Sequence, residues 1–87
     1  MNEKELKRLL KLLTPNQLQK ICKYLLIDDY YPILEDYYLR REKIFNIEYK
    51  HNLGKNSIIK ILRFCREKII IALKDDDFLR LFGDFFK

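Results

Sequence analysis

The stretch 57–74, SIIKILRFCREKIIIALK, constrains the fold most, because its apolar residues recur at the spacing of an α-helix. One stripe of that helix is formed by Ile58, Leu62, Cys65 and Ile69, and then by Ala72 or Leu73. Ile70 and Ile71 add apolar surface beyond this stripe, and a helix that is apolar nearly all round is normally surrounded by other elements. We therefore expect this segment at the centre of the domain, packed against at least two helices. Charged residues at 63 and 66–68 interrupt the pattern, so one helix or two shorter ones would fit.

The other apolar segments also have a helical period. Residues 5–13, 15–27, 33–51 and 78–86 each place apolar side chains three or four positions apart, and the segment 33–51 fits two helices with a bend or one long helix. Thr14, Pro15 and Gln17 have the spacing of a capping box, which predicts a helix start at residue 15. Gly54 is expected to be the left-handed cap that ends the preceding helix.

A chain of 87 residues can bury one core, and 48% apolar composition is sufficient for it. No segment alternates with a period of two for long enough to predict a strand. We therefore expect a single domain over residues 1–87, with an all-α fold and a compact bundle of five or six helices.

The two cysteines, Cys22 and Cys65, stand at apolar positions of predicted helices and have neither CxxC spacing nor a neighbouring histidine. Two reduced core thiols are the favoured interpretation, and a disulfide would require the two helices to touch. The first residues lack the apolar region of a signal peptide. We expect a cytoplasmic protein with no membrane span, although the basic helix 5–13 could also lie on an anionic membrane.

No arrangement of residues predicts catalysis. His51 is the only histidine and follows a predicted helix next to a turn, so a solvated side chain is the simplest interpretation. The sequence contains no phosphate-binding glycine loop, no GxSxG motif and no calcium loop. We expect no enzymatic activity, no cofactor and no metal site.

Charge is the feature most suggestive of a partner, since the net charge is +5 and the two signs are segregated. The predicted basic interaction patch consists of Lys7, Lys11, Lys60, Arg63 and Arg66. The predicted acidic interaction patch consists of Asp28, Asp29, Glu35, Asp36, Asp75, Asp76 and Asp77. Such a layout suits either self-association or a small basic regulator that binds nucleic acid. The segment HNLGKNSIIKIL faintly resembles a helix-turn-helix, but its turn is too short and its second helix too apolar for that motif.

The order of these features resembles the death-fold superfamily. KELKRLLKLLTPNQLQKICKYLLID resembles the first two helices of death-fold interaction domains, and KIFNIEYKHNLGKNSIIKILRFCREKIIIAL is similar to the later helices of death-effector domains. The portion RFCREKIIIALK resembles the ending of bacterial effector-associated, death-like domains. Lys68 stands where the Arg-x-Asp-Leu signature of death-effector domains has aspartate, so the resemblance is closer to the bacterial group.

This resemblance implies a six-helix Greek-key bundle that acts by homotypic association in a signalling or defence protein. Its partner would be another copy of the chain or a related helical domain. Nucleic acid is the alternative partner.

Overall fold

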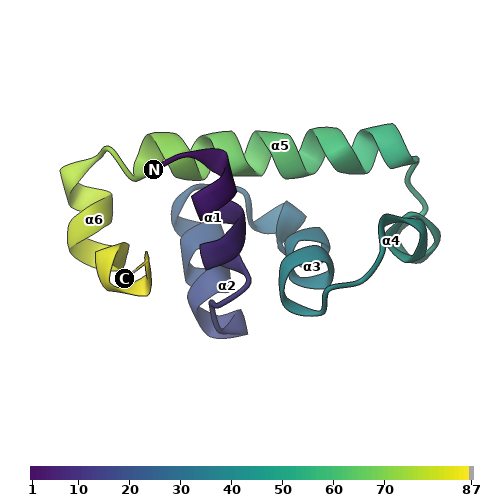
Figure 1. Ribbon diagram of the computed structural model, residues 1–87, viewed down its shortest axis with the longest axis horizontal. Helices are drawn as coiled ribbons and strands as arrows, with labels where there is room; N and C mark the ends of the chain where they lie inside the picture. Colours follow the sequence, from purple (N-terminus) through teal and green to yellow (C-terminus); the bar gives the residue numbers. More distant parts are fainter. Residues whose placement is uncertain (87) are drawn as a thin grey trace.

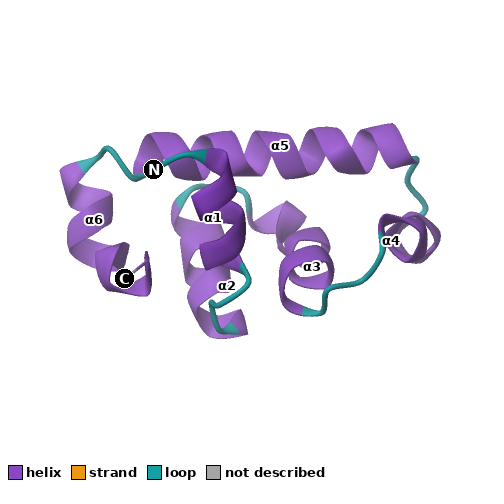
Figure 2. Ribbon diagram, viewed as in Figure 1, coloured by secondary structure: helices purple, strands orange, loops and turns teal. Residues whose placement is uncertain are grey.

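The computed structural model describes residues 1–86, so Lys87, the last residue of the expected domain, lies outside the described residues. The chain forms six helices, and no strand occurs within the described range (Figures 1 and 2). The six helices are α1 (Glu3–Leu10), α2 (Pro15–Tyr24), α3 (Tyr31–Leu34), α4 (Ile44–His51), α5 (Lys55–Ala72) and α6 (Asp76–Phe82). Short 3₁₀ turns cover Asp28–Tyr30 and Gly83–Phe86, and a π-helical turn continues α3 over Glu35–Leu39. The expected all-α bundle is confirmed.

Helix α5 is the longest element and remains unbroken for 18 residues. Its expected stripe is confirmed, because Ile58, Leu62, Cys65, Ile69 and Ala72 are all buried. The charged residues at 66–68 do not divide it, since Glu67 and Lys68 lie on its exposed side.

Helix α5 packs against at least two helices, as expected, but it is not surrounded by other elements at the centre of the domain. The helix runs along one edge of the molecule, with α1, α2 and α3 on one side of it (Figure 1). It packs against α1, α3 and α4, and its opposite side, which includes Lys60, Arg63 and Glu67, faces solvent. Ile71 is accordingly 69% exposed, because apolar residues outside the buried stripe have no helix to cover them.

Side-chain caps fix three of the helix starts. The Asn2 side chain accepts a hydrogen bond from Glu5 N at 2.8 Å, so α1 begins two residues earlier than expected. Thr14 and Gln17 form the predicted capping box, with distances of 3.2 and 3.0 Å. Asp75 accepts from the backbone amide of Asp77 at 2.8 Å and caps α6, which therefore starts before Phe78. Each cap satisfies an amide that would otherwise have no partner within the helix.

Three residues other than glycine adopt positive φ angles and redirect the chain. Asn52 (φ 53°) ends α4, whereas Gly54 has φ −75° and is the N-cap of α5, so the prediction of Gly54 as the left-handed cap is wrong. Asparagine tolerates this conformation because its short side chain can form local hydrogen bonds. Arg41 (φ 56°) lies in the segment between the π turn and α4. Residues 33–51 therefore form two helices rather than one.

Leu26 (φ 61°) lies in a Schellman-type end of α2. Leu26 N donates to Lys23 O at 3.2 Å, and Ile27 N donates to Cys22 O at 2.9 Å. The helix therefore ends at Tyr24 rather than at residue 27, and Leu26 is 86% exposed.

Both cysteines are free and buried, as expected from their apolar positions. Burial raises the pKa of the Cys22 thiol to about 12, with smaller contributions from Cys65 and Asp28. Burial also raises the pKa of Cys65 to about 11, although the charge of Arg66 opposes this shift. Both side chains therefore remain neutral at pH 7 and act as small apolar residues of the core.

We predict that Leu26→Gly stabilises the protein. The left-handed conformation costs leucine roughly 1–2 kcal/mol, and its exposed side chain makes few contacts that the substitution would remove. The free energy of unfolding should therefore rise by about 1 kcal/mol in the glycine variant. Leu26→Ala is the matched control, because it removes the same exposed side chain but keeps the Cβ and should give no comparable gain. Urea unfolding followed by circular dichroism measures both variants, and a loss of stability in Leu26→Gly would contradict the assignment of strain.

Candidate interaction surfaces

Asp36 is a buried charge that connects the π turn to α4. Its side chain is only 2% exposed, and it contacts three basic groups. Lys50 Nζ donates to Oδ1 at 3.0 Å, and His51 Nε2 lies 2.7 Å from Oδ2. Since an ionised carboxylate only accepts hydrogen bonds, His51 Nε2 is the donor. Arg40 Nε lies 3.8 Å from Oδ1, at the edge of ion-pair distance.

These contacts overturn two sequence-based expectations. Asp36 does not belong to an exposed acidic patch, because its carboxylate is turned inward to bind Lys50 and His51. His51 is not freely solvated, because its ring is mostly covered and bound to Asp36. Sequence reasoning missed the contact because its two sides are 14 and 15 residues apart in the chain.

The hydrogen bonds keep Asp36 ionised in spite of its burial. Burial alone would raise the pKa of this carboxyl group, but the hydrogen bonds and charges of His51 and Lys50 outweigh that effect and lower the pKa. The charged form is therefore the one that holds α4 against the π turn at neutral pH.

Arg66 forms a second buried polar contact. Its Nη1 donates to Tyr38 Oη at 2.9 Å, and its Nε lies 3.7 Å from a carboxylate oxygen of Glu3. The predicted assignment of Arg66 to a basic interaction patch is wrong, because this side chain lies within the bundle and joins α5 to α1 and to the π turn. Its position on the same stripe as Leu62 and Ile69 was the available signal, since residues four and three apart share a helix face.

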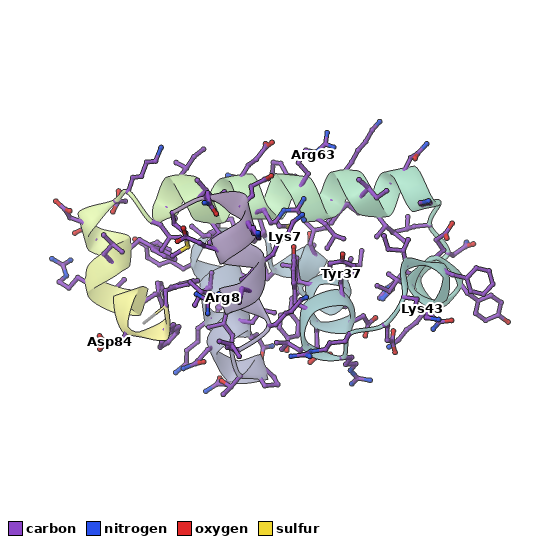
Figure 3. The ribbon with its side chains drawn as sticks, viewed as in Figure 1. Lys7, Arg8, Tyr37, Lys43, Arg63 and Asp84 are labelled. Carbon is purple, nitrogen blue, oxygen red and sulfur yellow. The ribbon has the colours of Figure 1, made fainter. Side chains whose placement is uncertain are left out.

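The remaining predicted basic residues are exposed on two helices. Lys7 belongs to α1 and Lys11 is the C-cap of that helix, and Lys60 and Arg63 belong to α5. Arg63 projects from the outer edge of α5, whereas Lys7 lies beside α1 on the face toward the viewer (Figure 3).

The remaining acidic residues occupy three separate places. Asp28 and Asp29 are exposed in the 3₁₀ turn after α2, and Glu35 is half-buried, where its Oε2 accepts from Tyr31 Oη at 2.8 Å. Asp75, Asp76 and Asp77 are exposed at the start of α6, where Asp77 pairs with Arg80 at 2.9 Å. Of the predicted acidic residues, these three form the densest cluster.

An exposed aromatic pair covers the outer side of α4. Phe45 is 75% exposed and Tyr49 is 90% exposed, whereas Ile47 on the other side of the same helix is fully buried. Phe45 and Tyr49 line an open hollow of about 450 Å³ together with Glu42, Asn46 and Lys50. We call Phe45, Tyr49 and this hollow the aromatic surface.

A second open hollow, of about 400 Å³, lies where α2, α5 and α6 meet. Its apolar lining consists of Tyr24, Leu25, Ile71, Ala72 and Phe78. Its charged rim consists of Lys68, Lys74 and Asp75. Tyr24 packs on Phe78 and Phe82 with ring centroids 5.9 and 5.3 Å apart, which keeps this wall in place. We call this the terminal hollow.

The two surfaces lie at opposite ends of the long axis of the molecule, which measures 38 Å (Figure 1). Lys43 marks the α4 end and Asp84 the α6 end (Figure 3). Sequence reasoning missed the aromatic surface, although the four-residue spacing of Phe45 and Tyr49 was visible. Both sides of α4 carry apolar residues, and the pattern alone does not say which side faces the core.

Over residues 1–86, no helix combines the length and apolar character needed to cross a membrane. Within the same range, no group of three or more histidine, cysteine or acidic side chains is placed to hold a metal ion. Comparison with protein-family models, curated proteins and solved structures finds no match for this chain.

We predict that Asp36→Asn destabilises the protein by about 2 kcal/mol at pH 7, because Lys50 and His51 lose a charged acceptor. The folded pKa of Asp36 is below its unfolded value of about 3.9, so its contribution is present above that pH and lost as the pH falls through the folded pKa. The stability difference between wild type and variant should therefore shrink below about pH 4. Urea unfolding at several pH values measures it.

The control for this experiment is Asp77→Asn, which removes an exposed ion pair and should change stability by less than about 0.5 kcal/mol. An Asp36→Asn variant as stable as wild type at pH 7 would show that the buried contact does not hold α4.

Proposed function

We propose that the chain is a non-enzymatic, self-associating protein-interaction module. The observation that carries this proposal is the presence of two exposed apolar surfaces, the aromatic surface and the terminal hollow, on a small domain whose other apolar residues largely form one core. Contiguous exposed apolar surface of this kind is typical of interaction sites.

The aromatic surface supports the proposal on energetic grounds. Phe45 and Tyr49 contribute little to the stability of the bundle because most of their area is in water. Covering each of them with a partner would gain roughly 1.5–3 kcal/mol. Aromatic residues in such positions are also enriched among the residues that dominate binding energy.

The partner proposed is another copy of this chain or a related helical domain. The resemblance to bacterial death-like domains, given by the order of helices and the RFCREKIIIALK segment, supports a role in a cytoplasmic signalling or defence protein. Exposed charges of both signs, such as Arg63 and Asp76, would then contribute to orientation rather than to most of the affinity.

We expect sedimentation velocity to show a weight-average mass that rises with protein concentration up to about 1 mM, the range that detects weak contacts. The double variant Phe45→Ser/Tyr49→Ser should associate at least about tenfold more weakly, because it removes the exposed rings and leaves the core intact. Leu12→Ser is the matched control, since Leu12 is 66% exposed and lines neither surface. A wild-type protein that stays monomeric throughout would refute the proposal.

A small nucleic-acid-binding regulator is the second candidate, and the cations of α1 favour it. Lys4, Lys7, Arg8 and Lys11 are all exposed, and no ion pair found among residues 1–86 involves them. Four such side chains could contact phosphates of one strand or duplex.

The second candidate predicts binding to duplex or single-stranded nucleic acid with a steep salt dependence. Four phosphate contacts would give a slope of log affinity against log salt of about −3 to −4, and Lys7→Ala/Lys11→Ala should reduce its magnitude by about 2. Fluorescence anisotropy with labelled oligonucleotides measures the slope. Absence of binding at low salt would exclude this function, whatever the result for self-association.

A further inference from the structure

We infer that the copies associate head to tail, with the aromatic surface of one copy seated in the terminal hollow of the next. This inference rests on the proposed self-association and names the two surfaces that carry it. The occupant of the terminal hollow is a second copy of this chain.

The side chains of the two surfaces suit an apolar contact. Phe45 and Tyr49 stand one helical turn apart on α4 and project as a pair of rings that the chain itself does not cover. The terminal hollow is open and has an aromatic and aliphatic lining, in which Ile71 and Tyr24 are themselves exposed. Aromatic rings pack favourably against such walls in tilted or edge-to-face arrangements.

The charges of the two ends are also complementary. Glu42 and Glu48 border the aromatic surface, and Lys50 beside them is already paired with Asp36. The rim of the terminal hollow carries two lysines, Lys68 and Lys74, and one aspartate, Asp75. Lys68 and Lys74 are exposed, so both are accessible to the carboxylates of a neighbour. Two aromatic surfaces facing each other would instead bring like charges together, which disfavours a symmetric contact through α4.

The positions of the surfaces decide the form of the assembly. Because they lie at opposite ends of the long axis, one copy cannot bring its own aromatic surface to its own terminal hollow (Figure 1). A dimer formed in this way still offers one free aromatic surface and one free terminal hollow. Such a heterologous contact adds further copies unless its rotation closes a ring.

The contact area available is small. The shorter dimensions of the molecule, 23 and 19 Å, give an end of about 400 Å² in cross-section, below the roughly 800 Å² per partner of a standard interface. The association is therefore weak in isolation, which sets the concentration range for its test.

Two single variants distinguish this head-to-tail contact from a symmetric contact through α4. Tyr49→Asp places a charge on the aromatic surface, and Ile71→Asp places one in the terminal hollow. Both residues are largely exposed, so neither change disturbs the core, and circular dichroism checks that both variants fold. Leu12→Asp is the matched control, because it adds the same charge at an exposed leucine outside both surfaces.

Sedimentation velocity should show that each single variant alone associates at least about tenfold more weakly than wild type, whereas Leu12→Asp associates as wild type does. An equimolar mixture of Tyr49→Asp and Ile71→Asp should form a dimer, because one variant keeps an intact hollow and the other an intact aromatic surface. The mixture should stop at the dimer, whereas the wild type continues to larger species.

Three results would overturn the inference while the proposed self-association stands. The first is wild-type association of Ile71→Asp together with a loss of association in Tyr49→Asp, which would indicate a symmetric contact through α4. Both variants could associate as wild type does, or the two could weaken without forming the mixed dimer. A wild-type protein that is monomeric at every concentration would instead overturn the proposed function together with the inference.

Discussion

The rest of the structure depends on the burial of one stripe of α5. Ile58, Leu62, Cys65 and Ile69 are almost completely removed from water by the helices packed against them, and this apolar contact is the main contribution available to a domain of 87 residues. A helix of 18 residues is about 27 Å long, which allows several short helices to share it as a common base. The short helices α3 and α4 are too short to be stable alone and depend on this support.

The sequence was sufficient for the helical class, a bundle of five or six helices and most of the core. It was sufficient because local rules decide these features: the three-to-four spacing of α5 and the Thr14–Gln17 capping box each need only neighbouring residues. It was insufficient wherever the outcome depended on distant contacts. The inward orientation of Asp36 requires Lys50 and His51, and the burial of Arg66 requires Tyr38, which is 28 residues away.

The candidate surfaces illustrate the same limit. Composition and charge segregation pointed to interaction, but the residues selected for it were charged, whereas the exposed residues that distinguish the structure are Phe45, Tyr49 and Ile71. An apolar residue in a helix with two apolar sides can face the core or the solvent, and only packing decides. Leu26 shows how far packing can override the local pattern: the left-handed end of α2 buries Ile27 and leaves Leu26 in water.

Helix α4 packs against the bundle through one fully buried apolar residue, Ile47, and through the contacts of Lys50 and His51 with Asp36. Its inward residues are therefore fixed by the fold, whereas the outward positions 45, 46 and 49 are free of that requirement. Descendants of this chain could exchange those outward residues with little cost to the bundle. The surface that α4 presents can therefore diverge between copies of a duplicated gene while the architecture that carries it is inherited unchanged.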